Sequence, residues 1–340
     1  VFQLYILNNL VNIIYKWCVP NCAKCTAGTR PQLIKKGSKI VQEFKSGFVS
    51  MVGRTNVGKS SIINSLVGEK VAAIANKPQT TRTAIRAIVN NENSQIIFID
   101  TPGIHKPKTK LGNTMVETAF GAISEVDITL FVIDATSDEI GKGDRIILDK
   151  IKEAKIKTIL IINKIDLVTK EHLARLIDLY KDEYDFKAVI PVSVTKNKNL
   201  DVIIKEIESN LKPGPAYYDI EEYTDQTLRQ LVEETIREKA LRLLDDEVPH
   251  GIYVETEKMK TRKTQNKERI YDVDVTIYCL RESHKGIIIG KNGNMLKKIG
   301  TYARQDLEKM LDTKVNLKIW VKVKEDWQNN DNLVKKFKPQ

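Results

Sequence analysis

Residues 53–60 read Gly-Arg-Thr-Asn-Val-Gly-Lys-Ser and constrain the fold most strongly, because they have the spacing of a P-loop. An apolar run at 48–52 precedes them, and a helix-like segment at 61–67 follows. Two glycines let backbone N–H groups approach a phosphate chain closely, and the N-terminus of the following helix adds its positive dipole. We therefore predict a nucleotide site with contacts from Gly53, Asn56, Val57, Gly58, Lys59, Ser60 and Ser61.

Two side chains of this loop have separate tasks in the predicted site. Lys59 supplies a positive charge to the phosphates. The hydroxyl of Ser60 is a ligand for a Mg²⁺ ion that bridges the β- and γ-phosphates. The loop thus predicts a divalent cation together with the nucleotide.

Short apolar runs alternate with helical stretches from residue 48 to about residue 211. This alternation predicts an α/β fold in which helices wrap a mostly parallel sheet. Each motif with recognisable chemistry directly follows a predicted strand, as expected where ligands bind beyond the carboxyl ends of the strands. The predicted strands are 48–52, 96–99, 128–133, 158–162 and 188–192.

The first motif after the P-loop is Asp100-Thr101-Pro102-Gly103, at the end of the strand predicted for 96–99. The carboxylate of Asp100 can hold Mg²⁺ through water. The N–H of Gly103 can sense the γ-phosphate, so the loop is expected to change conformation when that phosphate leaves.

A second motif, residues 163–166, follows the strand predicted for 158–162 and reads Asn-Lys-Ile-Asp. Guanine presents N1–H and N2–H₂ donors on one edge, and the carboxylate of Asp166 can accept from both. An adenine would leave this carboxylate unpaired, so the motif predicts selection of GTP over ATP. Further contacts with the base are expected from Asn163, Lys164, Ser193 and Val194.

Residues 212–215, Lys-Pro-Gly-Pro, predict a linker to a second region. Beyond it, the spacing predicts a helix, two strands, a helical region around a glycine loop and a third strand, at 227–244, 250–257, 271–280, 287–311 and 315–323. The basic segment 258–269 is typical of a loop, and the polar residues from 329 onward carry no clear signal.

The glycine loop 290–293, Gly-Lys-Asn-Gly, fits the GXXG loop of a KH domain, where small residues let the backbone press against nucleic-acid phosphates. The alternative is a helix N-terminal turn that binds nothing. Flanking apolar and basic residues favour the KH interpretation. The predicted RNA contacts are Lys285, Gly286, Ile288, Ile289, Gly290, Lys291, Asn292, Gly293 and Lys297.

Charge is unevenly distributed over the 340 residues, whose net charge is +11. Residues 1–47 carry +6 and residues 250–340 carry +8, which leaves −3 for the middle. A basic C-terminal end predicts a polyanionic partner there. The first acidic residue is Glu43, so 1–47 resembles an organellar targeting segment, with a disordered tail as the alternative.

Cysteine is too sparse for a disulfide scaffold, with four in the whole chain. Three of them, Cys18, Cys22 and Cys25, are spaced loosely like metal ligands, but the fourth ligand that tetrahedral zinc needs does not lie near them. No apolar run reaches the roughly 20 residues that a membrane-spanning helix requires. The predicted division is 1–47 extension, 48–211 GTPase domain, 212–226 linker, 227–327 KH domain and 328–340 tail.

Several motifs together resemble the Era family of P-loop GTPases. The similarity covers about 48–327 and is carried by 77–82 (Lys-Pro-Gln-Thr-Thr-Arg), 100–105, 236–239, 248–250, 281–286, 294–300 and 317–323. It implies a GTPase domain followed by an α+β type II KH domain, a slow GTPase activity, and binding to small-subunit ribosomal RNA near its 3′ end during ribosome assembly.

The resemblance also implies roles for individual residues. The threonine that ligates Mg²⁺ in the GTP state would be Thr81, with Thr80 as the less favoured choice, so Mg²⁺ would be held by Ser60, Thr81 and Asp100. The residues expected to act in hydrolysis are Lys59, Thr81 and Gly103. Ile104 stands where Ras-like enzymes carry the glutamine that orients water. A K⁺ ion coordinated by Asn56 is one way to align the water, and a merely local hydrogen bond of Asn56 is an equal alternative.

Two rival functions stay open at this point. One is a GTP-dependent switch that recruits a protein or an anionic membrane surface, with RNA binding incidental, and the other is an ATP-dependent enzyme. The expected partners are small-subunit ribosomal RNA and the small subunit, with a peripheral membrane contact as a further alternative. The basic N-terminus favours an organelle matrix, in a mitochondrion or plastid, over a bacterial cytoplasm.

Overall fold

The computed structural model describes residues 43–75, 77, 80–104, 107, 109–124, 126–263 and 268–337. The described residues from Phe44 onward form one compact unit. Cys18, Cys22, Cys25 and nearly all of the predicted targeting segment lie outside the described residues. None of the described helices is both long and apolar enough to cross a membrane.

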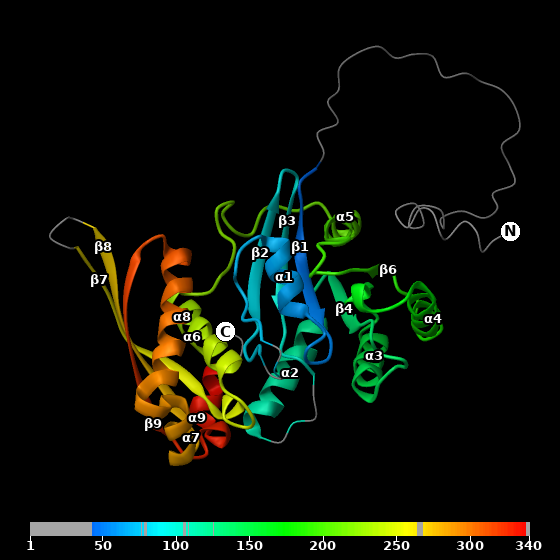
Figure 1. The fold of residues 1–340 in the computed structure, drawn as a ribbon. Coiled ribbons are helices and arrows are strands. Elements are labelled where there is room, and N and C mark those ends of the chain that lie inside the picture. The colour runs from blue at the N-terminus through cyan, green and yellow to red at the C-terminus, as the bar shows by residue number, and fades with distance from the viewer. Residues whose placement is uncertain are drawn as a thin grey trace, which may run out of the picture. The chain divides into compact units, whose positions relative to one another are not determined.

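A six-stranded sheet forms the centre of the N-terminal half (Figure 1). Its strand order is β2-β3-β1-β4-β5-β6, and all neighbours are parallel except the antiparallel pair β2 and β3. The strands are β1 Lys45–Val52, β2 Ile85–Asn91, β3 Ser94–Asp100, β4 Ile128–Asp134, β5 Thr158–Asn163 and β6 Ala188–Pro191. The predicted mostly parallel α/β sheet is therefore confirmed.

Strand β2 was not among the predicted strands. It pairs with β3 through a tight hairpin in which Asn91 lies opposite Ser94. The turn residues are Glu92 and Asn93, and this pair lacks the glycine of the strong two-residue hairpin signals, so the sequence pattern did not indicate the hairpin. β1 also begins three residues earlier than predicted, because Lys45 to Gly47 continue the ladder opposite the start of β3.

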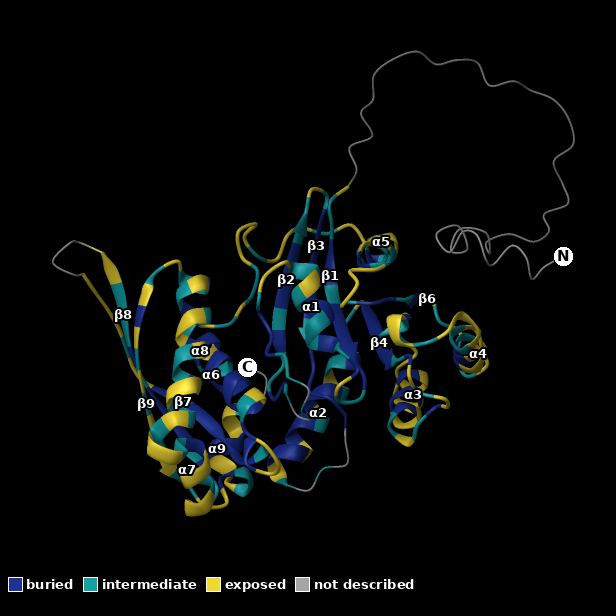
Figure 2. Cartoon of the chain, viewed as in Figure 1, coloured by how far each residue is buried: buried dark blue, intermediate teal, exposed yellow. Residues whose placement is uncertain are grey.

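Helices cover both faces of this sheet. Helices α1 (Lys59–Val67) and α5 (Leu200–Asn210) pack on one face, and α2 (Lys110–Ser124), α3 (Lys142–Ala154) and α4 (Lys170–Lys181) pack on the other. Alternate side chains of β4 serve the two layers, since Leu130 faces α1 and Phe131 faces α3. In Figure 2, strands β1 and β4 are accordingly buried.

The C-terminal half contains a three-stranded sheet in the order β7-β8-β9, with β7 and β8 antiparallel and β8 and β9 parallel. Helices α6, α7 and α8 share one hydrophobic core with it. The bounds are α6 Leu228–Leu243, β7 Tyr253–Lys263, β8 Arg269–Cys279, α7 Glu282–Ile289, α8 Asn294–Leu311 and β9 Lys314–Val323.

The prediction of a loop at 258–269 is wrong for most of that segment. The ladder between β7 and β8 continues as far as the pair Lys263 and Arg269. Basic residues are compatible with this exposed hairpin because acidic residues of the neighbouring strand pair with them, as Arg262 Nε does with Asp272 Oδ2 at 2.7 Å.

Residues after β9 pack against the GTPase half, although the sequence from 329 onward carried no clear signal. They form η4 (Trp327–Asn329), α9 (Asp331–Val334) and η5 (Lys335–Phe337). Trp327 is fully buried, and its Nε1 donates to the carbonyl of Gly251 at 2.9 Å. Leu333 and Val334 share a cluster with Leu111 and Met115 of α2. Such short elements have no periodicity of their own because distant partners stabilise them.

Candidate functional site

The loop between β1 and α1 has glycine where a side chain would collide with a neighbouring strand. A Cβ on Gly53 would lie 2.4 Å from the carbonyl oxygen of Val132 on β4. Gly58 has φ 100°, and a Cβ there would lie 2.2 Å from Nδ2 of Asn163. Both glycines are therefore required by close packing at the carboxyl ends of β4 and β5 as well as by access for a ligand.

Lys59 is buried under this loop. Its Nζ donates to the carbonyl oxygens of Gly53 (3.1 Å) and Arg54 (3.0 Å). Burial lowers the pKa of Lys59 to about 8, while the nearby carboxylate of Asp100 acts in the opposite direction. A phosphate oxygen at the loop is well suited to stabilise this charge, because the present partners are neutral carbonyls.

Three oxygen-bearing side chains that are predicted to hold Mg²⁺ lie together beside Lys59. Asp100 Oδ2 accepts from Ser60 Oγ at 2.7 Å and from Thr81 Oγ1 at 3.2 Å, and the two hydroxyl oxygens are 3.0 Å apart. Thr80 points away, since its hydroxyl donates to the carbonyls of Ala75 and Lys77. The geometry thus favours Thr81 over Thr80 as the third member of the cluster.

The donor set of this cluster fits a magnesium ion. Asp100 is fully buried, and burial raises its pKa against the opposing effect of Lys59. Its second oxygen, Oδ1, has no hydrogen-bond partner among the residues that the structure describes. One carboxylate and two hydroxyls are hard oxygen ligands of the kind that Mg²⁺ prefers, and an unpaired buried carboxylate oxygen calls for a cation or ordered water.

The loop after β3 packs against the P-loop. A Cβ on Gly103 would lie 2.7 Å from Cγ2 of Thr55, and the N–H of Ile104 donates to the carbonyl of Gly53 at 3.3 Å. The side chain of Ile104 is buried in the core beneath α2 and α3. It therefore cannot orient a water molecule, in agreement with its apolar chemistry.

The residues predicted to read guanine come together at the ends of β5 and β6. Asn163 Nδ2 donates to the carbonyl of Val57 at 2.9 Å and so ties this motif to the P-loop. Asp166 is exposed on η1 (Ile165–Leu167), and its Oδ1 accepts from Ser193 Oγ at 2.5 Å. Ser193 itself is held by the N–H of Lys196 (3.1 Å). Its neighbour Val194 packs on the core.

Asp134 completes this region and was not among the predicted site residues. It ends β4, and its Oδ2 accepts from Lys164 Nζ at 2.5 Å. Burial alone would raise the pKa of Asp134, but the hydrogen bonds from Lys164 and Thr136 lower it below its usual value. Its position at the end of a predicted strand was the available signal.

Asn56 lies in the P-loop with φ 64° and is exposed. It lines a cavity together with Lys59, Ser60, Ser61, Thr81 and Gly103, between the P-loop and the segment 73–81. This position places its side chain where the phosphates of a nucleotide are expected.

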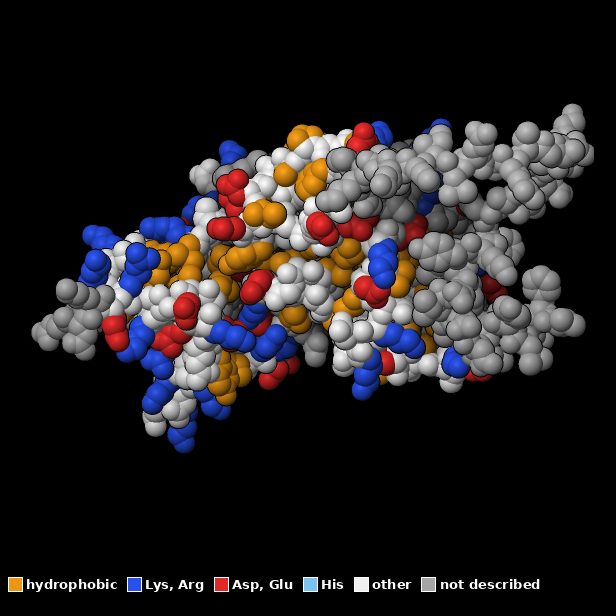
Figure 3. All heavy atoms as spheres, turned by 90° about the horizontal axis from the view of Figure 1, so that it is seen from above, with side chains coloured by type: hydrophobic (Ala, Val, Ile, Leu, Met, Phe, Trp, Pro, Cys, Tyr) orange, Lys and Arg blue, Asp and Glu red, His pale blue; other side chains and the backbone are white. Residues whose placement is uncertain are grey.

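The glycine loop 290–293 stands between α7 and α8 and is open to solvent. Gly290 (φ 72°) could not carry a side chain, because a Cβ there would lie 2.7 Å from Cβ of Met295. Lys291, Asn292 and Lys297 are exposed. Figure 3 shows Lys and Arg side chains over this half of the molecule, interspersed with acidic ones. The remaining predicted contacts are the exposed Gly286 and the partly buried Lys285, Ile289 and Gly293.

One predicted RNA contact is corrected by the structure. Ile288 is fully buried among core residues of the KH sheet and helices, so its side chain is not accessible to a ligand. A groove instead begins at Gly293 and runs between α8 and β9. Its lining includes the predicted Lys297 and also Leu296, Gly300, Thr301, Arg304, Leu317 and Ile319, which only the packing of α8 on β9 brings together.

Comparisons with known proteins agree with this arrangement. A family described as "50S ribosome-binding GTPase" matches residues 48–164, and a KH domain family matches residues 247–328. GTPase Era of Clostridioides difficile (strain 630) is 52% identical over 295 residues, which cover 86% of this chain and 98% of that protein. This chain belongs to the Era family. It is a GTPase with a KH domain.

Solved structures resemble this Era-family GTPase over the same share of its length. An Era variant of Aquifex aeolicus bound to GDP.AlF4- has a TM-score of 0.82 at 38% identity, covering 86% of this chain and 99% of that one. A structure of Era in complex with MgGDPNP and nucleotides 1506–1542 of 16S ribosomal RNA has a TM-score of 0.82 at 39% identity, with 86% and 98% covered.

The relatives also bear on the predicted compartment. GTPase Era of Caldanaerobacter subterraneus is 50% identical over 294 residues (86% of this chain and 97% of that protein), and it is bacterial like the relative from Clostridioides. The prediction of an organelle therefore finds no support among them.

Proposed function

We propose that this Era-family GTPase binds Mg²⁺ and GTP at the P-loop, binds small-subunit ribosomal RNA at its KH groove, and acts as a switch in assembly of the small ribosomal subunit. The observation that carries the proposal is the presence of both sites in one compact unit. Support for the partner comes from the related Era structure that holds a nucleotide and part of 16S ribosomal RNA.

In the proposed mechanism, the backbone of the P-loop and the charge of Lys59 hold the phosphates. Ser60, Thr81 and Asp100 would hold Mg²⁺, which when bound neutralises charge on the β- and γ-phosphates. Asp166 accepts from the N1–H and N2–H₂ groups of guanine, and Ser193 fixes its orientation. The N–H of Gly103 senses the γ-phosphate. When this phosphate leaves after hydrolysis, the loop after β3 is released.

Water alignment needs a group other than Ile104. We propose that Asn56 coordinates a K⁺ ion beside the phosphates. Replacing Asn56 by Ala should then erase any acceleration of GTP turnover by K⁺ over Na⁺, because the side-chain oxygen that holds the ion is gone. Phosphate release in equal concentrations of KCl and NaCl measures this. If K⁺ still accelerates the Asn56→Ala variant, the cation does not bind at Asn56.

RNA binding should depend on the glycine loop. Gly290→Asp places a carboxylate where phosphates are expected to pass and forces a side chain onto a residue with φ 72°. We expect at least about a tenfold loss of affinity for single-stranded 3′-end ribosomal RNA, measured by filter binding at moderate salt. Lys291→Glu, at an exposed position, should have a similar effect without backbone strain.

A matched control separates this site from a general effect of charge. Gly121→Asp makes the same change on an exposed turn of α2, where no neighbour lies within 4 Å of the new Cβ, and should leave RNA binding unchanged. Binding of the parent chain to anionic liposomes tests the rival function. Tight liposome binding combined with RNA affinity that is insensitive to Gly290→Asp and Lys291→Glu would contradict the proposal.

The compartment is a separate part of the proposal. The acid-poor residues 1–47 support an organelle, and the bacterial relatives support a bacterial cytoplasm. Crosslinking to ribosomal RNA in fractionated cells distinguishes the two, because the crosslinked RNA is that of the organelle in one case and that of the bacterial cytoplasm in the other.

A further inference from the structure

Helix α6 lies between the KH core and the GTPase domain, and both of its faces are buried. Val232, Ile236 and Ala240 belong to the KH core. The opposite face carries charged side chains, of which Arg237 and Glu238 are only 3% and 0% exposed. Charged residues are rarely this buried unless they are paired, so the face has a specific partner. That partner is the segment 70–82 of the GTPase domain, of which Lys70, Ile74 and Thr80 contact α6 and residues 76, 78 and 79 lie outside the described residues.

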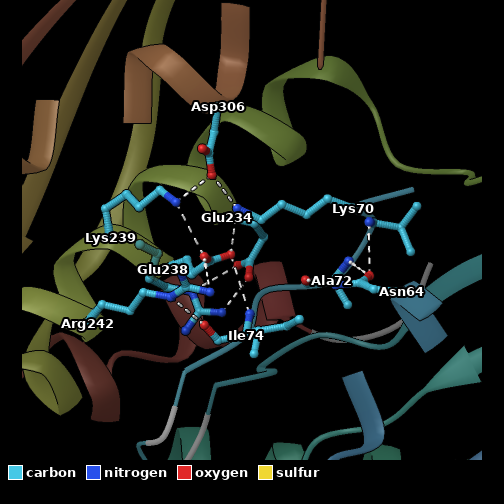
Figure 4. A network of polar contacts seen from close by, with 11 residues as sticks. Asn64, Lys70, Ala72, Ile74, Glu234, Glu238, Lys239, Arg242 and Asp306 are labelled. Atoms are coloured by element: carbon cyan, nitrogen blue, oxygen red, sulfur yellow. Dashed lines mark hydrogen bonds and ion pairs between the residues drawn. The ribbon is translucent and has the colours of Figure 1, made fainter. Parts of the chain in front are cut away.

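Glu238 holds one part of this segment. Its carboxylate lies 3.0 Å from Lys70 Nζ and 2.9 Å from Arg242 Nη2, and it accepts from the N–H of Ile74 at 3.4 Å (Figure 4). Arg242 Nε in turn donates to the carbonyl of Ile74 at 2.9 Å. Both backbone polar groups of Ile74 are thus bound by side chains from the KH domain.

Arg237 holds the segment again, close to the proposed magnesium ligand. Its Nη2 donates to the carbonyl of Thr80, and its Nε donates to Glu234 Oε1 at 3.0 Å. Thr80 directly precedes Thr81, whose hydroxyl lies 3.2 Å from Asp100 Oδ2. Helix α6 therefore positions the backbone next to Thr81, and this backbone in turn places the Thr81 hydroxyl at the nucleotide site.

The same charge cluster reaches the helix that follows the GXXG loop. Asp306 of α8 accepts from Lys70 Nζ at 2.6 Å and also from Lys239 Nζ (Figure 4). Lys70 comes shortly after α1, the helix that begins with Lys59. Lys70 and Lys239 each lie between the carboxylates of Glu238 and Asp306. These two lysines thus connect the segment that follows α1 with α6 and with α8, the helix that lines the proposed RNA groove.

We propose that Glu238 is a positioning residue for GTP hydrolysis and the link through which nucleotide state and RNA binding influence each other. This inference rests on the proposed function. Movement of the segment 70–82 on loss of the γ-phosphate would separate Glu238 from the N–H of Ile74, and would separate Lys70 from both Glu238 and Asp306 of α8. Coupling between two binding sites is reciprocal. If the nucleotide state changes the affinity for RNA through this segment, RNA that displaces α8 and α6 changes the affinity for GTP by the same factor.

The decisive variant is Glu238→Gln, which keeps an acceptor for Ile74 but removes the charge that Lys70 and Arg242 bind. We expect kcat for GTP to fall about tenfold or more while GDP affinity changes less than about twofold, because GDP needs the P-loop and Asp166 but not Thr81. We also expect the RNA affinities of the GDP-bound and GTP-analogue-bound forms to become equal within about twofold. The probes are a fluorescent GDP and a single-stranded oligonucleotide of 3′-end ribosomal RNA.

Glu233→Gln is the matched control, since it makes the same change on the same helix. The Glu233 carboxylate accepts from the N–H of Thr256 within the KH domain and does not reach the nucleotide site. Equal losses of kcat in Glu238→Gln and Glu233→Gln would overturn the inference. So would full turnover in Glu238→Gln together with an unchanged difference in RNA affinity between its two nucleotide states. If the parent chain binds RNA equally in both nucleotide states, the proposed switch fails, and the kcat of Glu238→Gln still decides whether Glu238 positions the segment.

Discussion

Replacing Lys59 by Ala should reduce GTP turnover by at least about a hundredfold, the usual cost of removing a preorganised donor from a site of developing charge. The variant loses the charge that faces the phosphates, and the fully buried Asp100 loses the cation that opposes the effect of burial on its pKa. A more readily protonated Asp100 is also a poorer ligand for a divalent cation. Both effects weaken the same site.

Nucleotide titration and phosphate release measure this effect, with thermal unfolding as the check on folding. Lys205→Ala is a suitable control, because Lys205 pairs with Asp201 on the exposed face of α5, away from the loop. Normal turnover in Lys59→Ala would contradict the role given to Lys59.

Replacing Asp166 by Asn should change the preferred base from guanine to xanthine. Ser193 Oγ donates to Oδ1 of Asp166, and an asparagine oxygen can still accept this bond. The outward-facing group then becomes an N–H₂ donor, which suits the carbonyl of xanthine and opposes the N2–H₂ group of guanine. We expect the ratio of GTP to XTP affinity to fall by roughly a thousandfold or more, because a site built to pair a polar group rejects the analogue that cannot pair.

Competition with fluorescent GDP by GTP, XTP and ATP measures the ratio. Ser193→Ala is the control, since it removes the hydrogen bond to Asp166 and leaves the carboxylate unchanged. It should lower the affinity for GTP without favouring XTP. An unchanged preference in Asp166→Asn would exclude direct contact with the base, and equal affinity of the parent chain for ATP and GTP would support the ATP-dependent alternative.

The nucleotide site could be predicted almost completely from the sequence. Most of its residues follow a predicted strand, and parallel strands bring their carboxyl ends together without further information. Lys59 and Asp100 meet for this reason. Thr81 follows no predicted strand, and only the resemblance to the Era family pointed to it. Asp134 also ends a strand, but its pairing with Lys164 depends on which strands are neighbours, and the order β4-β5 appears only in the folded sheet.

Other features depended on contacts that local patterns do not encode. The sequence alone indicated apolar residues around the GXXG loop, yet only the packing of α7 shows that Ile288 belongs to the core and that the groove continues to Arg304 and Ile319. Likewise, Trp327, Leu333 and Val334 of the tail after β9 pack in one cluster with Leu111 and Met115 of α2, which lie far away in the chain.

By itself, the sequence determined the motifs of this protein and predicted their chemistry: a triphosphate loop, a carboxylate placed to select guanine and a glycine loop suited to RNA. These depend on short motifs in which residue type and spacing are sufficient. Only the tertiary structure decided how the two halves meet. The pattern of α6 gives no sign that Arg237 and Glu238 are buried, because charged residues are ordinary on an amphipathic helix. Their partners in the GTPase domain lie more than 150 positions away, and no local periodicity carries that information.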